Sequence, residues 1–390
     1  MRLNVLALIW VAASLAAPAP VASLSDESNS TSTSSGITLD ELQSQANANI
    51  LASLDKRHED LTSRGQPSPC NRNTVAIRKE YGKLTSVEKI NYINAVKCLQ
   101  QKSPRTPLLA APGVRTRYDD FVATHINQTL QIHYTGNFLS WHRYYVWIYE
   151  KALREECGYT GYQPYWEWSK YVAAPQDNPM LDGSSTSLSG NGVFVPNRSD
   201  VILTSPGVAS LYLKPGLGGG CIYNGPFANY TVNLGPISSG TTGVDGGLGY
   251  NPRCLSRDIN PYTAARFLTW SDVLSIMSQT DIYNFQMNLQ GIPGIGIGAH
   301  GGGHYTVGNA NDPSFFVHHG QVDRVWTIWQ WLDPVNRTYA LAQTNTYLNS
   351  PPSANTTLND TVQLGFAGGA TKEIGELMSV VEGDFCYIYV

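Results

Sequence analysis

HGGGHYTVGNANDPSFFVHHGQVDR, residues 300–324, is the stretch around which this 390-residue chain is organised. Only one other segment has a comparable density of histidine: THINQTLQIHYTGNFLSWHRYY, residues 124–145. Of the chain's eight histidines, seven lie in these two blocks: His125, His133, His142, His300, His304, His318 and His319. Imidazole is a ligand for zinc, copper, iron and nickel, so the two blocks together predict one metal centre.

The spacing within the second block narrows the kind of metal site. His300 and His304 are four residues apart, so a helix would place both on one face, although each of the three intervening glycines costs up to ~1 kcal/mol in a helix. A zinc protease of the H-E-x-x-H type needs Glu after the first histidine, and Gly301 stands there. No cysteine or carboxylate cluster accompanies the histidines. Two three-histidine sites that hold copper and bind O2 fit this ligand set.

Two acidic residues near the second block have structural explanations. Asn311-Asp312-Pro313 is typical of a helix N-terminus, with Asp312 as the cap. Asp323 lies one helical turn after His319. It could accept a hydrogen bond from the ring nitrogen of a ligand histidine that does not bind the metal, or it could pair with an arginine. Helix phase alone leaves open whether His318 or His319 is the ligand, because either can head an apolar stripe.

Helix signals surround both blocks. We expect two helices between residues 70 and 100, the second capped by Thr85 with Glu88 three positions on. A long helix should follow residue 136 and stop at Gly158. Residues 172–262 are rich in Gly, Ser, Pro and Asn and predict long loops, with Cys221–Cys254 as a local disulfide candidate. A further helical region over 269–291 and a C-terminal strand complete the pattern.

The N-terminus and the cysteines indicate export. Residues 1–17 have an early Arg, a short apolar run and a small-residue end, as in a secretory signal peptide. Residues 18–65 predict a pro-segment or flexible region with a dibasic Lys56–Arg57 pair, or an ordinary solvated helix. Six cysteines allow three disulfides in fifteen pairings. Seven N-x-[ST] sequons predict a glycosylated, extracellular protein: Asn29, Asn127, Asn197, Asn229, Asn336, Asn355 and Asn359.

Charge excludes some partners. The net charge is −4 with no long basic run, so nucleic-acid binding is not expected. No stretch beyond the leader is long and apolar enough to suggest a membrane partner. The sequence carries no signal for a particular oligomeric state.

The two blocks resemble the copper-binding regions of tyrosinases and catechol oxidases, the polyphenol oxidase family. FLSWHRYYVWIYEKAL resembles the region that binds the first copper, CuA, and HGGGHY with NDPSFFVHHGQVDRVW resembles the region that binds the second, CuB. Tyr387-Ile388-Tyr389 is similar to the Y-x-Y motif that closes the family's catalytic domain, which Arg78 and Asp323 would brace. The resemblance covers roughly residues 70–390 and is closest to the short, secreted fungal members.

This resemblance implies a mainly α fold, in which a four-helix bundle holds the dicopper centre among long loops and a few short strands. Residues 66–390 would form the catalytic domain, with no C-terminal lid domain. CuA would be held by His125, His133 and His142, and CuB by His300, His304 and His319, because the family uses the second histidine of the pair. Gly301 and Tyr305 would lie near the phenolic substrate.

Three departures bear on the reaction. Gln131 stands where many members have a cysteine that is crosslinked to a CuA histidine. No Glu precedes His300 within ten residues; Gln286 and Gln290 are the nearest polar substitutes. Gly301 replaces an Asn that is common in strong monophenol hydroxylases. We therefore expect oxidation of o-diphenols to o-quinones with O2, with hydroxylation of monophenols as the alternative. A hemocyanin-like oxygen carrier is a third class, against which the short, secreted chain without an assembly domain argues.

Overall fold

The structure, a computed structural model, describes residues 38–204, 207–238, 241–308 and 310–390, and its compact unit spans Thr38–Val390. The helices are α1 (Leu39–Ser63), α2 (Ser86–Leu99), α3 (Arg117–Gln128), α4 (Phe138–Cys157), α5 (Pro261–Phe267), α6 (Trp270–Met277), α7 (Ile282–Gln290), α8 (Gly298–Val307), α9 (Ser314–Leu332) and α10 (Pro334–Arg337). The mainly α fold class is confirmed.

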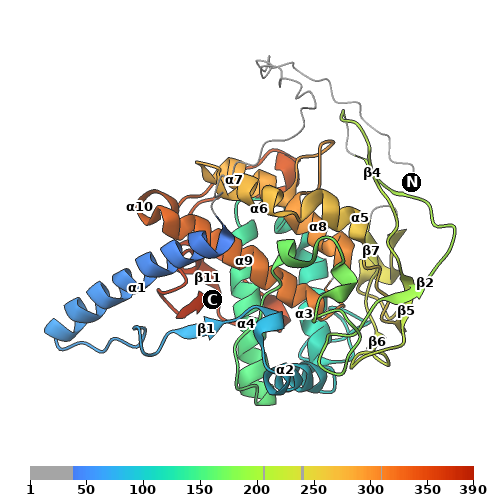
Figure 1. Cartoon of the computed structure of the whole chain (residues 1–390), viewed down its shortest axis with the longest axis horizontal. Helices are drawn as coiled ribbons and strands as arrows, with labels where there is room; N and C mark the ends of the chain where they lie inside the picture. The colour runs from blue at the N-terminus through green and yellow to red at the C-terminus, as the bar shows by residue number, and fades with distance from the viewer. Residues whose placement is uncertain (1–37, 205–206, 239–240, 309) are drawn as a thin grey trace, which may run out of the picture. The chain divides into compact units, whose positions relative to one another are not determined.

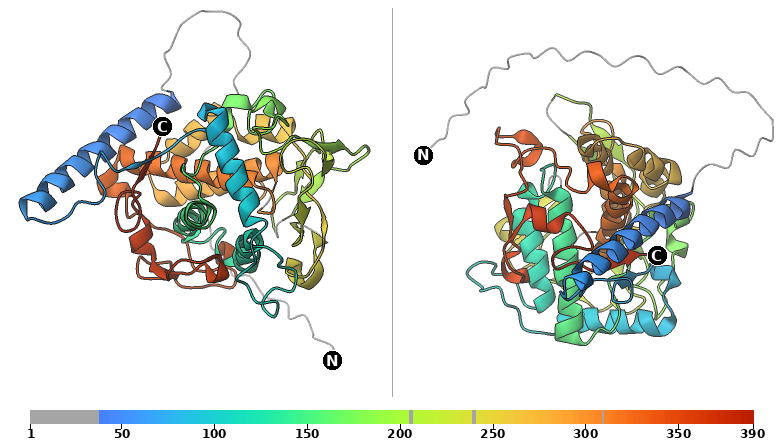
Figure 2. Two further views of the ribbon diagram at one scale, coloured as in Figure 1. Left: turned by 90° about the horizontal axis from the view of Figure 1, so that it is seen from below. Right: turned by 90° about the vertical axis from the view of Figure 1, so that its left-hand side faces the viewer.

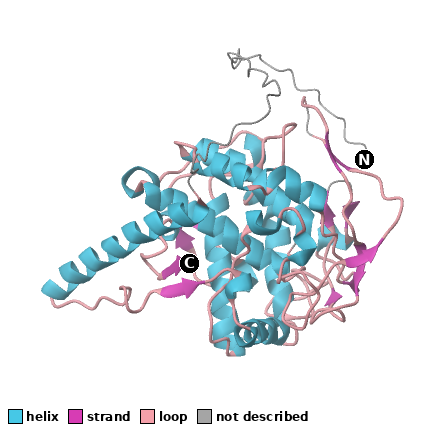
Figure 3. Ribbon diagram, in the orientation of Figure 1, coloured by secondary structure: helices cyan, strands magenta, loops and turns pink. Residues whose placement is uncertain are grey.

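The strands of the described residues are short and pair only two at a time (Figure 3). They are β1 (Ala76–Arg78), β2 (Gly192–Phe194), β3 (Val201–Leu203), β4 (Leu211–Leu213), β5 (Gly219–Ile222), β6 (Thr231–Val232), β7 (Ile237–Ser238), β8 (Thr241–Thr242), β9 (Arg253–Cys254), β10 (Thr361–Val362), β11 (Lys372–Glu373) and β12 (Tyr387–Tyr389). Most of them lie in the region predicted as loops.

The centre of the core is the packed pair of helices α4 and α9 (Figure 1). Both helices are buried along most of their length. Their buried residues include charged side chains, which are paired inside the core, as Arg143 of α4 is with Asp323 of α9. Tyr149 of α4 stacks on Phe316 of α9 with ring centroids 3.4 Å apart. Helix α4 ends where the sequence predicts, because Gly158 adopts the left-handed conformation that terminates helices.

Helix α1 is part of the compact unit, which starts at Thr38, whereas the sequence predicts a catalytic domain that starts at residue 66. A capping box of Thr38 and Glu41 opens α1, and the helix lies beside α9 (Figures 1 and 2). Buried apolar residues occur along it at helical spacing: Leu39, Leu42, Ala46, Ile50 and Leu54. The polar Ser/Thr run that precedes α1 hid this boundary. Removal of the segment as a pro-peptide stays a prediction.

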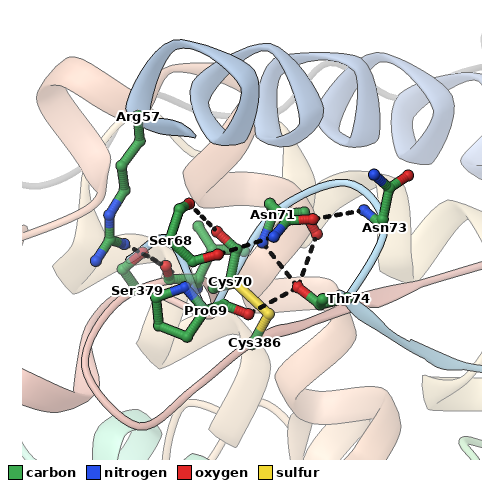
Figure 4. The surroundings of a disulfide bond; sticks show 10 residues. Arg57, Ser68, Pro69, Cys70, Asn71, Asn73, Thr74, Ser379 and Cys386 are labelled. Atoms are coloured by element: carbon green, nitrogen blue, oxygen red, sulfur yellow. Dashed lines mark hydrogen bonds between the residues drawn. A yellow bond between two sulfur atoms is a disulfide. The ribbon is translucent and has the colours of Figure 1, made fainter. Parts of the chain in front are cut away.

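The segment that follows α1 is fastened to the C-terminal end of the compact unit. Strand β1 pairs in parallel with β12, and a disulfide joins Cys70 to Cys386 (Figure 4). Beside that disulfide, the guanidinium of Arg57 donates a hydrogen bond to the Val381 carbonyl at 2.7 Å. Disulfides also join Cys98 to Cys157 and Cys221 to Cys254, the latter as predicted.

Two helices are expected between residues 70 and 100, and the prediction of the first one is wrong. Strand β1 and a short 3₁₀ turn (Tyr81–Lys83) occupy that segment, because β1 finds its partner more than 300 residues away, in β12. The second helix, α2, is confirmed with its Thr85–Glu88 capping box. The predicted signal peptide, residues 1–17, lies outside the described residues. None of the described helices combines the length and hydrophobicity that crossing a bilayer requires.

Candidate metal centre

Four helices and one loop deliver seven histidines to one place. Helix α3 begins at a Thr116–Asp119 capping box and carries His125 in its last turn. His133 lies in the loop after α3, and α4 provides His142 in its second turn. The second block contributes from α8 and α9. The ring nitrogens form two groups, within each of which the closest atoms lie no more than 4.8 Å apart: His125, His133 and His142; and His300, His304, His318 and His319.

Backbone carbonyls fix the orientation of several of these rings. Nδ1 of His133 lies 2.8 Å from the Thr129 carbonyl, and Nδ1 of His142 lies 2.7 Å from the Phe138 carbonyl. A carbonyl can only accept, so Nδ1 carries the proton and Nε2 keeps its lone pair. Nε2 of His142 is buried without a hydrogen-bond partner among the described residues, as is Nε2 of His125.

In the second group, three Nε2 atoms converge. Nε2 of His304 lies 3.1 Å from Nε2 of His300 and 3.2 Å from Nε2 of His319. Nδ1 of His304 is 3.1 Å from the Gly308 carbonyl, which again leaves the Nε2 lone pair free. Two ligands bound at about 2.0–2.1 Å to a tetrahedral metal are separated by about 3.3 Å. The observed spacing therefore matches three ligands around one ion.

His318 is engaged differently from its neighbour. The indole Nε1–H of Trp168 donates a hydrogen bond to Nδ1 of His318 at 3.0 Å, in a fully buried setting. Because this bond occupies the Nδ1 lone pair, a neutral His318 must carry its proton on Nε2. Neither nitrogen then offers a free lone pair to a metal.

The two groups face each other across a short gap. The rings of His142 and His319 stack with centroids 4.4 Å apart and an interplanar angle of 7°, and His133 lies 5.5 Å from His300 between ring centroids. Burial lowers the pKa of all seven imidazoles, to about 4 for His133 and His304. All are consequently neutral at pH 7, the form that binds a metal.

A cavity of about 290 Å³ opens onto this centre. Its lining is largely apolar and, among the described residues, contains no carboxylate: Val122, His125, Ile126, Thr129, His133, Ile237, His304, Tyr305, Gly308, Ala310, Asn311 and Phe315. Tyr305 is thus at the cavity, whereas Gly301 is not part of its lining. A substrate role for either residue stays a prediction.

Tight packing around α8 explains why glycines stand between His300 and His304. A Cβ at Gly303 would lie 2.1 Å from Cε1 of His318, and one at Gly302 would lie 2.8 Å from Cβ of Phe267. Gly308 has φ 129° and ends α8 with the carbonyl that His304 contacts. The glycines therefore let α8 approach its neighbours closely enough to bring its histidines to the centre.

The two acidic residues have structural roles. The carboxylate of Asp312 accepts the Ser314 N–H at the start of α9 and also pairs with buried Arg257, although the N-cap position of α9 is Pro313 and not Asp312 as expected. Asp323 pairs with Arg143 and Arg78, and its carboxylate forms no hydrogen bond with any histidine of the described residues. The same carboxylate accepts hydrogen bonds from the hydroxyls of Tyr387 and Tyr389, the two tyrosines of the Y-x-Y motif, at 2.6 Å each. The expected bracing of this motif is therefore present.

Sequence reasoning missed three groups that position the histidines. Trp168, Gly308 and the carbonyl of Thr129 all act through the fold, and no pattern at those positions marks them. The two glutamines named as polar substitutes, Gln286 and Gln290, are not part of the cavity lining and bind the backbone just after His133. Gln286 donates to the Thr135 carbonyl at 2.6 Å, and Gln290 accepts the Tyr134 N–H at 2.7 Å.

The residues present fit a pair of metal ions. The close Nε2 atoms of His300, His304 and His319 would repel one another unless a cation or proton lay between them. Buried, unpartnered Nε2 atoms in the first group cost free energy unless they have a ligand. A set of neutral imidazoles without thiolate or carboxylate suits copper or zinc.

Comparisons with known proteins agree with this geometry. Residues 115–332 match the family model described as the common central domain of tyrosinase. A tyrosinase-like protein of Emericella nidulans is 42% identical over 78% of this chain and 88% of its own length. The N-acetyl-6-hydroxytryptophan oxidase of the same species is 39% identical over 82% of this chain and 93% of its own length. Among solved structures, a variant polyphenol oxidase from Thermothelomyces thermophila superposes with a TM-score of 0.86 at 44% identity, covering 90% of this chain and 97% of that one.

Proposed function

The chain belongs to the tyrosinase family of oxidases, and from that premise we propose that it is a secreted copper enzyme that oxidises o-diphenols to o-quinones. CuA is held by His125, His133 and His142. CuB is held by His300, His304 and His319. The observation that carries this assignment is the convergence of the three Nε2 atoms in the second group, at 3.1 and 3.2 Å.

Trp168 supports the choice of His319 over His318. Its hydrogen bond to Nδ1 of His318 removes that imidazole from the ligand set, and the His318 ring packs against Gly303. His319 instead stacks on His142 of the other group and presents Nε2 to the shared point. His318 then serves to hold α8 against α9.

The bound copper pair would supply the electron acceptance: two diphenols each lose two electrons and two protons, and one O2 becomes two waters. The chain's part is to bind and orient the ring and to exclude water. Phe315 and Val122 give the cavity apolar walls next to His125 and His304. The carbonyls of Thr129 and Phe138 keep the ligand rings in the orientation that binding requires.

Diphenols are favoured over monophenols because a monophenol must first lose its phenolic proton. None of the described residues lining the cavity is a carboxylate that could take it. Hydroxylation of monophenols is the alternative. One relative is named for oxidising N-acetyl-6-hydroxytryptophan, so a hydroxylated aromatic larger than catechol is a second substrate class.

Secretion is supported by the disulfides and by the position of the sequons. Three disulfides are formed among the described residues. The sequon asparagines in that part of the chain are all exposed: Asn127, Asn197, Asn229, Asn336, Asn355 and Asn359. Expression in a eukaryotic host followed by glycosidase treatment should shift the mass of the exported protein; an unmodified chain retained in the cell would contradict secretion.

The test of the reaction compares 4-methylcatechol with 4-methylphenol on copper-loaded protein. We expect quinone formation from the diphenol without delay, and slow turnover with a lag from the monophenol. Rapid oxidation of the monophenol without added catechol would make hydroxylation the main activity. If neither 4-methylcatechol nor 4-methylphenol gives quinone, phenol oxidation is excluded.

A further inference from the structure

A second, larger cavity adjoins the one at the metal centre. Its volume is about 530 Å³, and it shares with the first cavity three residues at the end of α8: His304, Tyr305 and Gly308. The two cavities therefore adjoin each other at the C-terminal end of α8. A substrate ring held beside the histidines could extend a substituent into the second space.

The hairpin of β3 and β4 forms one wall of the second cavity, and it is anchored to α8. Strands β3 and β4 are paired through three residues each. The inward-facing side chains of Leu211 and Leu213 pack in a small apolar cluster with Phe267 and Ile297, against which Tyr305 also packs. The wall is thus held at a fixed place relative to the shared residues.

Charge distinguishes the second cavity from the first. Its lining includes three cations, Arg198, Lys214 and Arg257, against one carboxylate, that of Asp258. The Arg257 guanidinium is buried, binds Asp312 through two hydrogen bonds of 2.8 and 2.7 Å, and donates to backbone carbonyls. Its charge is fully compensated within the protein.

Arg198 is compensated in the same way. It binds Asp258 through hydrogen bonds of 2.6 and 3.0 Å, and its remaining donors reach the carbonyls of Val195 and Gly216. Asp258 also accepts the N–H groups of Gly216 and Gly218, which stiffens this wall. Neither arginine has charge left for a ligand.

Lys214 is the cation that remains. It is exposed, and no carboxylate among the described residues pairs with it; its ammonium lies 5.7 Å from the centroid of the Tyr262 ring. Its backbone is nevertheless fixed, because the buried side chain of Asn260 donates to the Lys214 carbonyl at 2.7 Å and also caps α5. Lys214 therefore contributes an uncompensated positive charge to the lining of the second cavity, on a backbone that is held in place.

We propose that the second cavity is a substrate subsite in which Lys214 binds a carboxylate carried by the substituent of the phenolic ring. The proposal rests on the proposed function and deepens it: the preferred substrates are o-diphenols with an anionic side chain. The ring enters the apolar cavity, and the side chain passes Tyr305 toward Lys214. A neutral catechol would be oxidised without this contact.

The test uses full-length copper-loaded protein and two probes that differ only in charge, 3-(3,4-dihydroxyphenyl)propanoic acid and its primary amide. An ion pair near the surface contributes at most about 1 kcal/mol, or a factor of about five. We expect kcat/KM for the acid to exceed that for the amide by up to about fivefold. Lys214→Gln should bring the ratio close to one, Lys214→Arg should retain it, and added salt should reduce it.

Lys102→Gln is the matched control, since Lys102 is an exposed lysine that lines neither cavity. It should leave the ratio unchanged. A ratio that is the same in the unmodified protein and in Lys214→Gln would overturn the subsite. Calorimetric binding of acid and amide to the same proteins separates the two proposals. A charge preference in binding that Lys214→Gln abolishes, without oxidation of 4-methylcatechol, would retain the subsite and reject only the proposed reaction.

Discussion

Trp168 donates its indole N–H to Nδ1 of His318 at 3.0 Å, and this bond separates two adjacent histidines of α9 into different roles. The neighbouring ring, that of His319, has its Nε2 3.2 Å from Nε2 of His304. Adjacent positions on a helix point about 100° apart. Both rings nevertheless belong to the second histidine group, so the hydrogen bond from Trp168, rather than position on the helix, distinguishes His318 from the proposed ligand His319.

Substitution of the two histidines should separate these roles. We expect His319→Asn to lose the CuB ion, leaving one copper per chain and no diphenol oxidation. His318→Asn should keep two coppers but unfold at lower denaturant concentration, because it loses a buried hydrogen bond of about 1 kcal/mol and some packing. Copper content by mass spectrometry of the purified proteins measures the difference; loss of copper from His318→Asn alone would reverse the assignment.

The close approach of α8 to α9 depends on Gly303. A methyl group there would lie 2.1 Å from Cε1 of His318, so Gly303→Ala must displace either a helix or the ring. We expect a loss of about 1–3 kcal/mol in the free energy of unfolding, as for other overpacked cores. Gly375→Ala is the control, because its nearest neighbour would be 3.3 Å away, and it should change stability by less than about 0.5 kcal/mol. Equal effects of the two changes, measured by urea unfolding, would show that the contact is not restrictive.

The buried imidazoles should make the copper-free protein sensitive to acid. Burial lowers the pKa of His133 and His304 to about 4, whereas the unfolded chain binds these protons near pH 6.5. The unfolded state therefore binds more protons between pH 6.5 and about 4, and stability falls as pH falls through that window. We expect the free energy of unfolding to drop by at least about 1 kcal/mol from pH 7 to pH 4.5, measured by urea unfolding. Constant stability over that range would contradict the buried, neutral state.

Much of the local structure could be predicted, because it depends on neighbours in the sequence. Thr85 and Glu88 form the expected capping box, Gly158 ends α4, and the spacing of His300 and His304 places both on one helix. Contacts between distant segments could not. The β1–β12 pair joins segments about 300 residues apart, so neither strand carries a local signal of its partner.

The same limit applies to the candidate site. Its histidines stand out in the sequence because seven of eight are clustered. The groups that orient or supplement them are spread along the chain in segments without a motif, as with Trp168 in a turn and Lys214 after a short strand. Only the folded chain brings Trp168 to His318 and places Lys214 in the lining of a cavity that His304 also lines.

Helix α1 should be required for stability rather than dispensable. Ile50 is fully buried against the core, and the guanidinium of Arg324 on α9 donates to the side chain of Gln43. We expect Ile50→Ala to cost about 2–5 kcal/mol, the usual range for a buried large-to-small change. Ser53→Ala, on the exposed face of the same helix, should be nearly neutral. Thermal unfolding of both variants checks this, and an unaltered melting temperature for Ile50→Ala would favour a removable pro-segment.

The central claim is that two copper ions, one in each histidine group, together oxidise diphenols. Its most direct test is a copper titration of the metal-free protein, in which bound copper per chain is plotted against the initial rate of 4-methylcatechol oxidation. The rate should stay low through the first equivalent, rise as the second copper binds, and reach its maximum at two coppers per chain. A maximum at one copper, or a protein with two coppers that forms no quinone, would contradict the account.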